Sequence, residues 1–201
     1  SPKYIMWYEY VLETAKAVKA INKDVVLVTN GYINQEPLEL LLNYVDSMNI
    51  DLKSFDDKTY HKLCNASLDP VLNTIKVAAR KVHLEVTTLL VTNANDTLAE
   101  VEAISKFLSL INPNIVLHLS RYFPRYKLND DATDINFMKA ALLTAKKYLH
   151  YVYIGNLNSQ DNNSYCHHCG DVLVQRNGYQ IKNRIVNTLC PNCKKEIPFI
   201  I

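Results

Sequence analysis

The chain has 201 residues, of which 48% are hydrophobic and 21% are charged, and its formal net charge at pH 7 is +2. This size predicts one globular domain with a small appendage, and the near-neutral charge does not favour a nucleic-acid or acidic-membrane partner. The sequence has no apolar run of membrane-span length, no signal-peptide pattern, and no GxGxxG or P-loop motif. We therefore expect a cytoplasmic protein that uses neither of those nucleotide-binding loops.

Helices and strands are expected to alternate through most of the chain. The first helix is expected to start from a Ser1-Pro2 cap and to end near Ile21, and its buried face should carry Trp7, Val11, Ala15 and Val18. The apolar run Val25–Val28 then predicts a strand that is buried on both faces, as in parallel sheets covered by helices on each side. Further strands are expected at 48–53, 84–91, 115–121 and 151–155, and helices at 34–45, 56–63, 70–82, 97–111 and 137–148.

This repeated order of strand and helix predicts parallel strand pairing with right-handed crossovers. The expected fold class is α/β: a partial (β/α) barrel of parallel strands with helices outside, followed by a small C-terminal zinc ribbon. We expect the barrel to occupy residues 1–157, and a linker with the ribbon to occupy residues 158–201.

Polar residues follow the ends of the expected strands, and in a βα barrel the carboxyl ends of the strands meet at one mouth. Thr29 and Asn30 follow the first strand, and Asp51 and Lys53 follow the second. Because Asp51 and Lys53 are two residues apart on an extended chain, their side chains share a face and can bind the ammonium and the carboxylate of a zwitterion. Two simpler interpretations stay open: Asp51 and Lys53 pair with each other at the rim, and Thr29 and Asn30 only form a turn.

Several segments resemble radical S-adenosylmethionine (SAM) enzymes related to the activating enzymes of glycyl-radical enzymes such as pyruvate formate-lyase. They are TNGY after the first strand, DLK after the second, TTLL in the third and HLSRYFPRYK around the end of the fourth. The subgroup called the AmmeMemoRadiSam system radical SAM enzyme is the most similar, because it also has a YVYIGN strand and a trailing four-cysteine segment.

The resemblance implies an enzyme that, when complete, cleaves SAM reductively at a [4Fe–4S] cluster and abstracts hydrogen through a 5′-deoxyadenosyl radical. It also implies an electron donor such as ferredoxin or flavodoxin, and a protein substrate or a Memo- or AMMECR-like partner. The residues that it assigns to SAM are Thr29, Asn30, Asp51 and Lys53, and those that it assigns to the substrate side are His118, Arg121 and Tyr122.

Two elements of the family pattern are missing from this sequence. The Cys-x3-Cys-x2-Cys loop that holds the radical cluster is absent, and the glutamate of a Glu-Pro motif would fall on Ser1 of Ser1-Pro2. We therefore expect either a carboxyl-terminal portion of a longer enzyme or a degenerate relative, and no cluster binding or SAM cleavage by this chain alone. The alternative function is a non-catalytic zinc-ribbon module on a βα scaffold, which docks onto protein or nucleic acid.

Two Cys-x-x-Cys pairs separated by twenty residues predict a metal site near the end of the chain. Between them, Asn177-Gly178 predicts the turn of a β-hairpin. Four thiolates close the coordination shell of a tetrahedral zinc ion, so the expected role is structural; an iron–sulfur cluster in the same ligands stays open. The expected ligands are Cys166, Cys169, Cys190 and Cys193.

Overall fold

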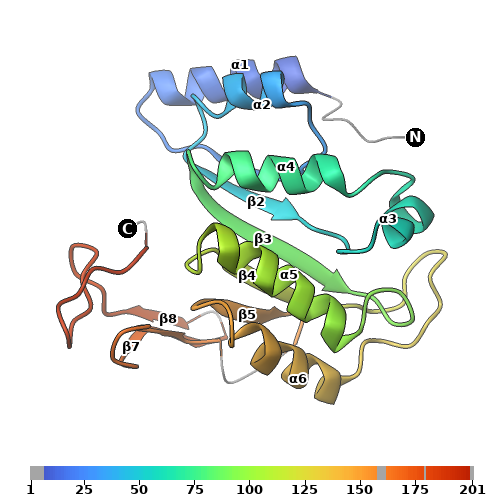
Figure 1. Ribbon diagram of the computed structural model, residues 1–201. Coiled ribbons are helices and arrows are strands. Elements are labelled where there is room, and N and C mark those ends of the chain that lie inside the picture. The colour runs from blue at the N-terminus through green and yellow to red at the C-terminus, as the bar shows by residue number, and fades with distance from the viewer. Residues whose placement is uncertain (1–6, 158–161, 179, 200–201) are drawn as a thin grey trace.

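The computed structural model describes residues 7–157, 162–178 and 180–199. In this part of the chain, parallel strands form a five-stranded sheet in sequence order: β1 (Val26–Thr29), β2 (Ser47–Asp51), β3 (His83–Leu90), β4 (Val116–Arg121) and β5 (Val152–Gly155). The helices are α1 (Tyr8–Ala20), α2 (Gln35–Leu41), α3 (Asp57–Cys64), α4 (Asp69–Ala78), α5 (Leu98–Ile111) and α6 (Ile135–Ala145). This confirms the α/β fold with a partial barrel of parallel strands (Figure 1).

The sheet has one face covered by helices and one face that is largely polar. Along β3, Leu84, Val86 and Leu90 are buried, and the residues between them are half-buried. The same alternation occurs in β2. Since side chains alternate across a strand, the buried set packs against the helices, and the other set forms the inner face of the partial barrel.

The expectation that the first strand is buried on both faces is wrong. Val26 and Val28 are 66% and 72% exposed, whereas Leu27 between them packs against the core. Within the described residues, β1 pairs with β2 alone and is the edge of the sheet. Helices cover only the face that carries Leu27, so an apolar run did not mean burial on both sides.

Helix α1 also differs from its prediction. The Ser1-Pro2 cap lies outside the described residues, and the described helix begins at Tyr8 with Trp7 at the N-cap position. Trp7 is 69% exposed, so its placement on the buried face is wrong; Leu12 and Ala15 are the buried residues. The Tyr8 hydroxyl donates to the Pro37 carbonyl at 2.9 Å and ties α1 to α2.

The four cysteines lie in loops next to a small antiparallel sheet. We call the described residues from 164 to 199, which include this sheet and the cysteines, the ribbon. It contains β6 (Ser164–Tyr165), β7 (Val172–Asn177) and β8 (Gln180–Asn183). The predicted hairpin is confirmed, but Asn177 pairs with Gln180 as the last residue of β7 and is not part of the turn. The arrowheads of β2 and β3 point toward α3 in Figure 1, whereas β7 and β8 lie at the other end of the sheet. Among the described helices, none is long and apolar enough to cross a membrane.

Candidate functional site

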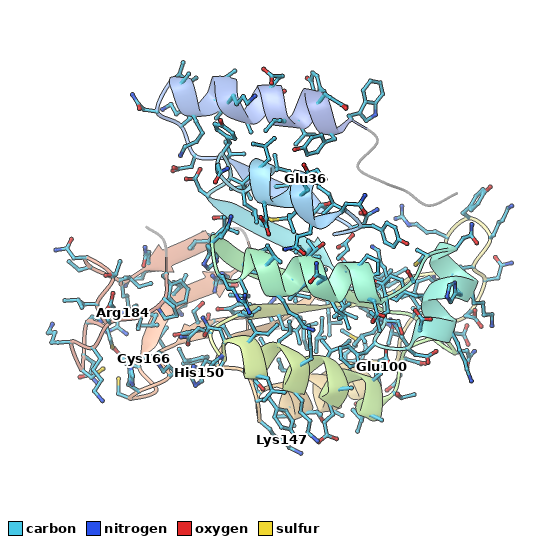
Figure 2. The ribbon with its side chains drawn as sticks, turned by 45° about the horizontal axis from the view of Figure 1, so that its top comes forward. Glu36, Glu100, Lys147, His150, Cys166 and Arg184 are labelled. Atoms are coloured by element: carbon cyan, nitrogen blue, oxygen red, sulfur yellow. The ribbon has the colours of Figure 1, made fainter. Side chains whose placement is uncertain are left out.

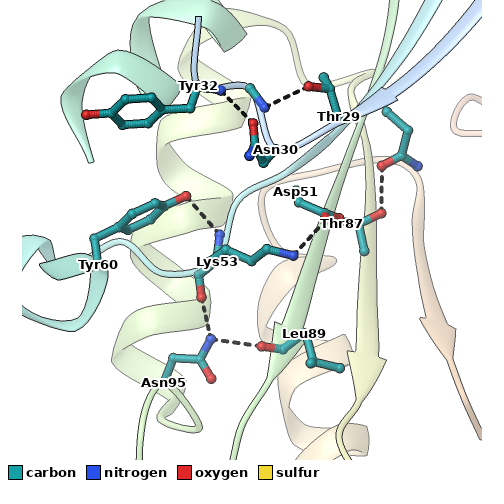
Figure 3. Close-up of polar contacts among 11 residues, drawn as sticks. Thr29, Asn30, Tyr32, Asp51, Lys53, Tyr60, Thr87, Leu89 and Asn95 are labelled. Carbon is teal, nitrogen blue, oxygen red and sulfur yellow. Dashed lines mark hydrogen bonds and ion pairs between the residues drawn. The ribbon is translucent and has the colours of Figure 1, made fainter. Parts of the chain in front are cut away.

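A tight turn follows β1 at the carboxyl edge of the sheet. The Thr29 Oγ1 accepts from the Gly31 N–H at 3.2 Å, and the Asn30 Oδ1 accepts from the Tyr32 N–H at 3.0 Å (Figure 3). Gly31 has φ of +69°, and a Cβ there would lie 2.7 Å from the Ile50 Cγ2. The turn therefore needs glycine, and the turn-forming interpretation of Thr29 and Asn30 is confirmed as at least one of their roles.

Asp51 and Lys53 form an ion pair at the end of β2. The Lys53 Nζ lies 2.6 Å from the Asp51 Oδ2, and the two side chains are 41% and 34% exposed, respectively. This is the rim pair that the sequence left open. A partly exposed pair of this kind contributes little to stability, on the order of 1 kcal/mol or less. Both charges therefore stay within reach of a ligand at the edge.

The main chain of Lys53 is fixed on both sides. Its N–H donates to the Tyr60 hydroxyl oxygen at 3.0 Å, and its carbonyl accepts from the Asn95 Nδ2 at 2.7 Å (Figure 3). The Asn95 side chain, 2% exposed, also donates to the Leu89 carbonyl at 2.9 Å. Asn95 thus joins the loop after β2 to the end of β3, and it orients the loop that carries Lys53.

Sequence reasoning missed this supporting network. It also includes Glu100, in the first turn of α5. The Thr97 side chain caps this helix, because its Oγ1 accepts from the Glu100 N–H at 3.2 Å. The Glu100 carboxylate, however, accepts from the Ser54 hydroxyl at 2.6 Å and from the Phe55 N–H. Both partners are more than forty residues away, so no local pattern could have identified them.

The predicted SAM residues occupy adjacent strand ends, but they do not all share one surface. Asn30 and Lys53 line a cavity of about 210 Å³ together with Tyr32 and Tyr60. Thr29 pairs in register with the buried Ile50, so it lies on the helix-covered side of the sheet and not on the side of Asp51. The edge therefore brings Asn30 and Lys53 together around a cavity, with Asp51 beside Lys53.

The predicted substrate-side residues lie in two different places. His118 is on the inner face of β4, where its Nε2 lies 2.7 Å from the Glu85 Oε2. The Tyr122 side chain is 4% exposed and donates its hydroxyl to the Leu128 carbonyl at 2.9 Å. The Arg121 Nε donates to the Thr133 carbonyl at 2.7 Å. Arg121 and Tyr122 are thus bound within the loop after β4, and their assignment to the substrate side stays a prediction.

Glu85 is the centre of a charged cluster on the inner face. Besides His118, the His83 Nε2 lies 3.5 Å from the Glu85 Oε1. The hydrogen bonds from His118 and His83 lower the pKa of Glu85 to about 2. The carboxylate is therefore ionised at neutral pH, with an imidazole at each oxygen.

The four-cysteine group has the geometry of a metal site. The sulfur atoms of Cys166, Cys169, Cys190 and Cys193 all lie within 4.8 Å of one another. The distances from Cys166 Sγ to Cys193 Sγ and from Cys169 Sγ to Cys190 Sγ are both 3.7 Å. Four thiolates around a tetrahedral zinc ion lie about 3.8 Å apart, so the arrangement fits such an ion.

The surroundings of two of the sulfur atoms change their pKa values in opposite directions. The pKa of Cys169 is lowered to about 7, chiefly because its sulfur accepts a hydrogen bond from the Asp171 backbone N–H. Burial raises the pKa of Cys166 to about 11. A buried thiol of this kind loses its proton when a cation binds, so the four cysteines can act together as metal ligands.

Known proteins resemble both the sequence and the fold. The family model of the Radical SAM superfamily matches residues 5–108. The uncharacterized protein MJ0808 of Methanocaldococcus jannaschii is 36% identical over 98% of this chain and 60% of its own length. A candidate glycyl-radical enzyme activating enzyme of the same organism, MJ1632, is 32% identical over 68% of this chain and 54% of its own length. The chain thus spans little more than half the length of these two relatives.

Solved structures agree in fold. A domain of pyruvate-formate lyase-activating enzyme from Bacteroides vulgatus superposes with a TM-score of 0.65 at 16% identity, over 74% of this chain and 91% of that domain. Streptococcus suis SuiB superposes with a TM-score of 0.57 at 11% identity, over 72% of this chain and 35% of SuiB. At such identities the likeness concerns the fold alone. The match to the family model covers more than half of the sequence, and by it the chain belongs to the radical SAM superfamily.

Proposed function

We propose that this chain is the carboxyl-terminal part of a radical SAM enzyme of the activating-enzyme type, most similar to the AmmeMemoRadiSam subgroup. In such an enzyme, SAM and a [4Fe–4S] cluster supply a 5′-deoxyadenosyl radical that abstracts hydrogen from the substrate. The substrate is then a protein, as the name of MJ1632 implies for that relative. The electron donor is of the ferredoxin or flavodoxin type.

One observation supports this proposal most: an ion pair lies at the carboxyl edge of the sheet, and its lysine lines a cavity together with the Asn30 amide. The Asp51 carboxylate can accept from the ammonium of a methionyl group, and the Lys53 ammonium can bind its carboxylate. Asn30, on the neighbouring strand end, adds an amide to the same rim. Thr29 belongs to the proposal as the residue that fixes the turn carrying Asn30.

The positions of the cysteines indicate which metal centres this chain can hold. Four of the five are gathered in the ribbon, and the fifth, Cys64, lies in α3. We propose that the ribbon holds a structural zinc ion, because four thiolates leave no open coordination position. We also propose that this chain alone does not assemble the radical cluster, since its cysteines do not contain the Cys-x3-Cys-x2-Cys pattern.

Metal analysis tests whether this chain alone binds zinc and does not assemble the radical cluster. After anaerobic reconstitution with iron and sulfide, we expect about one zinc ion and no stoichiometric iron per chain, because four thiolates at this spacing suit zinc. Iron bound in stoichiometric amounts, with a low-temperature electron paramagnetic resonance signal after reduction, would show that this assignment is wrong.

Binding of SAM tests the edge itself. In the complete enzyme, Asp51→Asn and Lys53→Met are each expected to weaken SAM binding at least tenfold, the effect of losing one charge-assisted hydrogen bond. Lys58→Met, a neutralised lysine in the nearby α3, is the control. Folded variants that bind SAM as the wild type does would remove Asp51 and Lys53 from the site. Failure of the complete enzyme to bind SAM would favour the docking-module alternative.

A further inference from the structure

A second and larger cavity lies at the other end of the sheet. It has a volume of about 530 Å³ and shares no lining residue with the cavity near Lys53. Its sheet wall includes the first residues of four strands, Val26, Ser47, His83 and Val116. Its opposite wall comes from the C-terminal part of the chain and includes Asn162, Arg176 and Phe199. Figure 2 shows Cys166 and Arg184 of this part at the end of the molecule away from Glu100.

The ribbon side of this cavity supplies a fixed positive charge. The Arg176 Nη1 donates to the Asn162 carbonyl at 2.9 Å and to the Ser164 hydroxyl at 2.8 Å. The guanidinium carbon lies 5.2 Å from the centre of the Tyr153 ring. The Tyr153 hydroxyl in turn lies 2.5 Å from the Ser164 Oγ. Arg176 is therefore held against the sheet by contacts that leave its charge beside the cavity.

The sheet side supplies a carboxylate whose two oxygens are both occupied. Glu85 lines the cavity, and its oxygens face the Nε2 atoms of His118 and His83. Among the lining residues it is the only carboxylate. A cationic ligand would have to displace an imidazole from Glu85 and would be repelled by Arg176. An anionic ligand that binds beside Arg176 displaces no imidazole and is attracted by the guanidinium.

The wall also has apolar side chains on the inner face and in the C-terminal part, among them Val26, Val116 and Phe199. A volume of this size falls in the range of pockets for small organic ligands, about 300 to 1,000 Å³, and such pockets combine apolar walls with a few polar groups. We propose that the cavity between the sheet and the ribbon binds a small organic carboxylate, with its carboxylate at Arg176 and its apolar body against Val26, Val116 and Phe199.

This site is independent of the proposed SAM edge, because the two lie at opposite ends of the strands. The ligand is a free metabolite-sized acid. A carboxylate on a polypeptide has the same chemistry, and a short acidic peptide in the experiment below distinguishes that source.

The test measures binding of 3-phenylpropionate to the metal-loaded protein by heteronuclear NMR. The controls are 3-phenylpropylamine and 3-phenylpropanol, which share its carbon body. We expect the acid to bind about tenfold more tightly than either control, the value of one charge-assisted contact, and to shift the signals of Val26 and Arg176. Equal binding of the three probes, or tighter binding of the amine, would overturn the proposal. Tighter binding of a tetrapeptide that ends in glutamate would overturn the choice of a free acid.

Two variants with opposite expected effects on acid binding sharpen the test. Arg176→Gln is expected to abolish the tenfold preference for the acid, whereas Glu85→Gln removes the only lining carboxylate and is expected to strengthen acid binding severalfold. The matched control is Arg184→Gln, on the same ribbon, where the arginine pairs with Asp171 at 3.1 Å and does not line the cavity. If Arg176→Gln disturbs the ribbon, seen as loss of bound metal, Glu85→Gln decides alone. Loss of acid binding in Lys53→Met would place the ligand at the other edge and overturn the proposal.

Discussion

The parallel sheet and the ribbon are built by different physical means. The sheet and its helices share a core to which each of the six described helices contributes buried apolar side chains. The buried cluster of the ribbon is small, and two of its members are cysteines: Cys166, Leu173, Val174, Cys190 and Ile197. We therefore expect burial of apolar surface to be enough for the sheet, and we expect the ribbon to need a bound metal in order to fold.

Removal of the metal is expected to have the largest effect. A chelator, or Cys190→Ser, should unfold the ribbon and leave the sheet folded, because structural zinc binding contributes on the order of 10 kcal/mol to such small units. Amide signals measured by NMR should lose dispersion for residues 164–199 and keep it for β2 to β4. Cys64→Ser in α3 is the control and should keep the metal. If the amide signals of the ribbon keep their dispersion without metal, the proposed difference between the ribbon and the sheet is wrong.

The same metal site gives an expected pH dependence. Burial raises the pKa of Cys166 to about 11, so protons compete with the metal for this sulfur. The apparent metal affinity should therefore fall as the pH is lowered from 8 to 6, measured by competition with a chromophoric chelator. An affinity independent of pH would show that the thiols are already deprotonated in the metal-free chain.

A substitution that creates a cavity in the core between the sheet and its helices should have the next largest effect on stability. Leu117 on β4 is fully buried, and Leu117→Ala is expected to lower the free energy of unfolding by about 2 to 5 kcal/mol. Bound metal should be unchanged, measured in parallel with denaturant unfolding. The control is Leu110→Ala on α5, where the side chain is 87% exposed and the expected change is about 0.5 kcal/mol or less. Similar losses in both variants would contradict the assignment of the core.

Loss of the Asn95 side chain is expected to have a smaller effect on stability. This effect should extend to the proposed SAM site. Asn95→Ala leaves the carbonyls of Lys53 and Leu89 and the N–H of Val91 without this partner. We expect a loss of about 1 to 3 kcal/mol in the free energy of unfolding and weaker SAM binding in the complete enzyme. Asn73→Ala, an exposed position on α4, is the control. Unchanged SAM binding in a less stable Asn95→Ala variant would limit Asn95 to a structural role.

The smallest expected effect concerns Glu85 and acid. Its pKa in the folded chain, about 2, lies below the ordinary value of 4.5, chiefly through the hydrogen bond from His118. A lowered pKa stabilises the fold above pH 4.5, and this contribution is lost as the pH falls toward 2. Glu85→Gln should therefore flatten the decline in denaturation midpoint between pH 4.5 and pH 2. Glu13→Gln, at a side chain that is 70% exposed, should decline as the wild type does.

The sequence predicted the elements whose signals are local. The strand and helix order, the hairpin at Gly178 and the cysteine cluster all rest on short patterns, and each is present. The sequence did not predict which faces are covered. Val26 and Val28 are as apolar as a buried strand requires, yet their exposure depends on the position of β1 in the sheet, which no local pattern encodes.

The candidate sites show the same division. Asp51 and Lys53 were found because an alternating strand places both on one face, and they do pair. The partners of Lys53 and Glu85 come from other strands and helices, so the roles of Asn95 and of the His83, Glu85 and His118 cluster needed the three-dimensional structure.

The sequential strand order has a consequence for synthesis on the ribosome. Because each of β2 to β5 pairs with the strand that precedes it in the chain, every strand can join a neighbour that has already emerged. The ribbon cannot form in this stepwise way, since Cys166 must wait for Cys193 before the metal can be enclosed. The nascent chain should therefore acquire its sheet one strand at a time and capture its metal last.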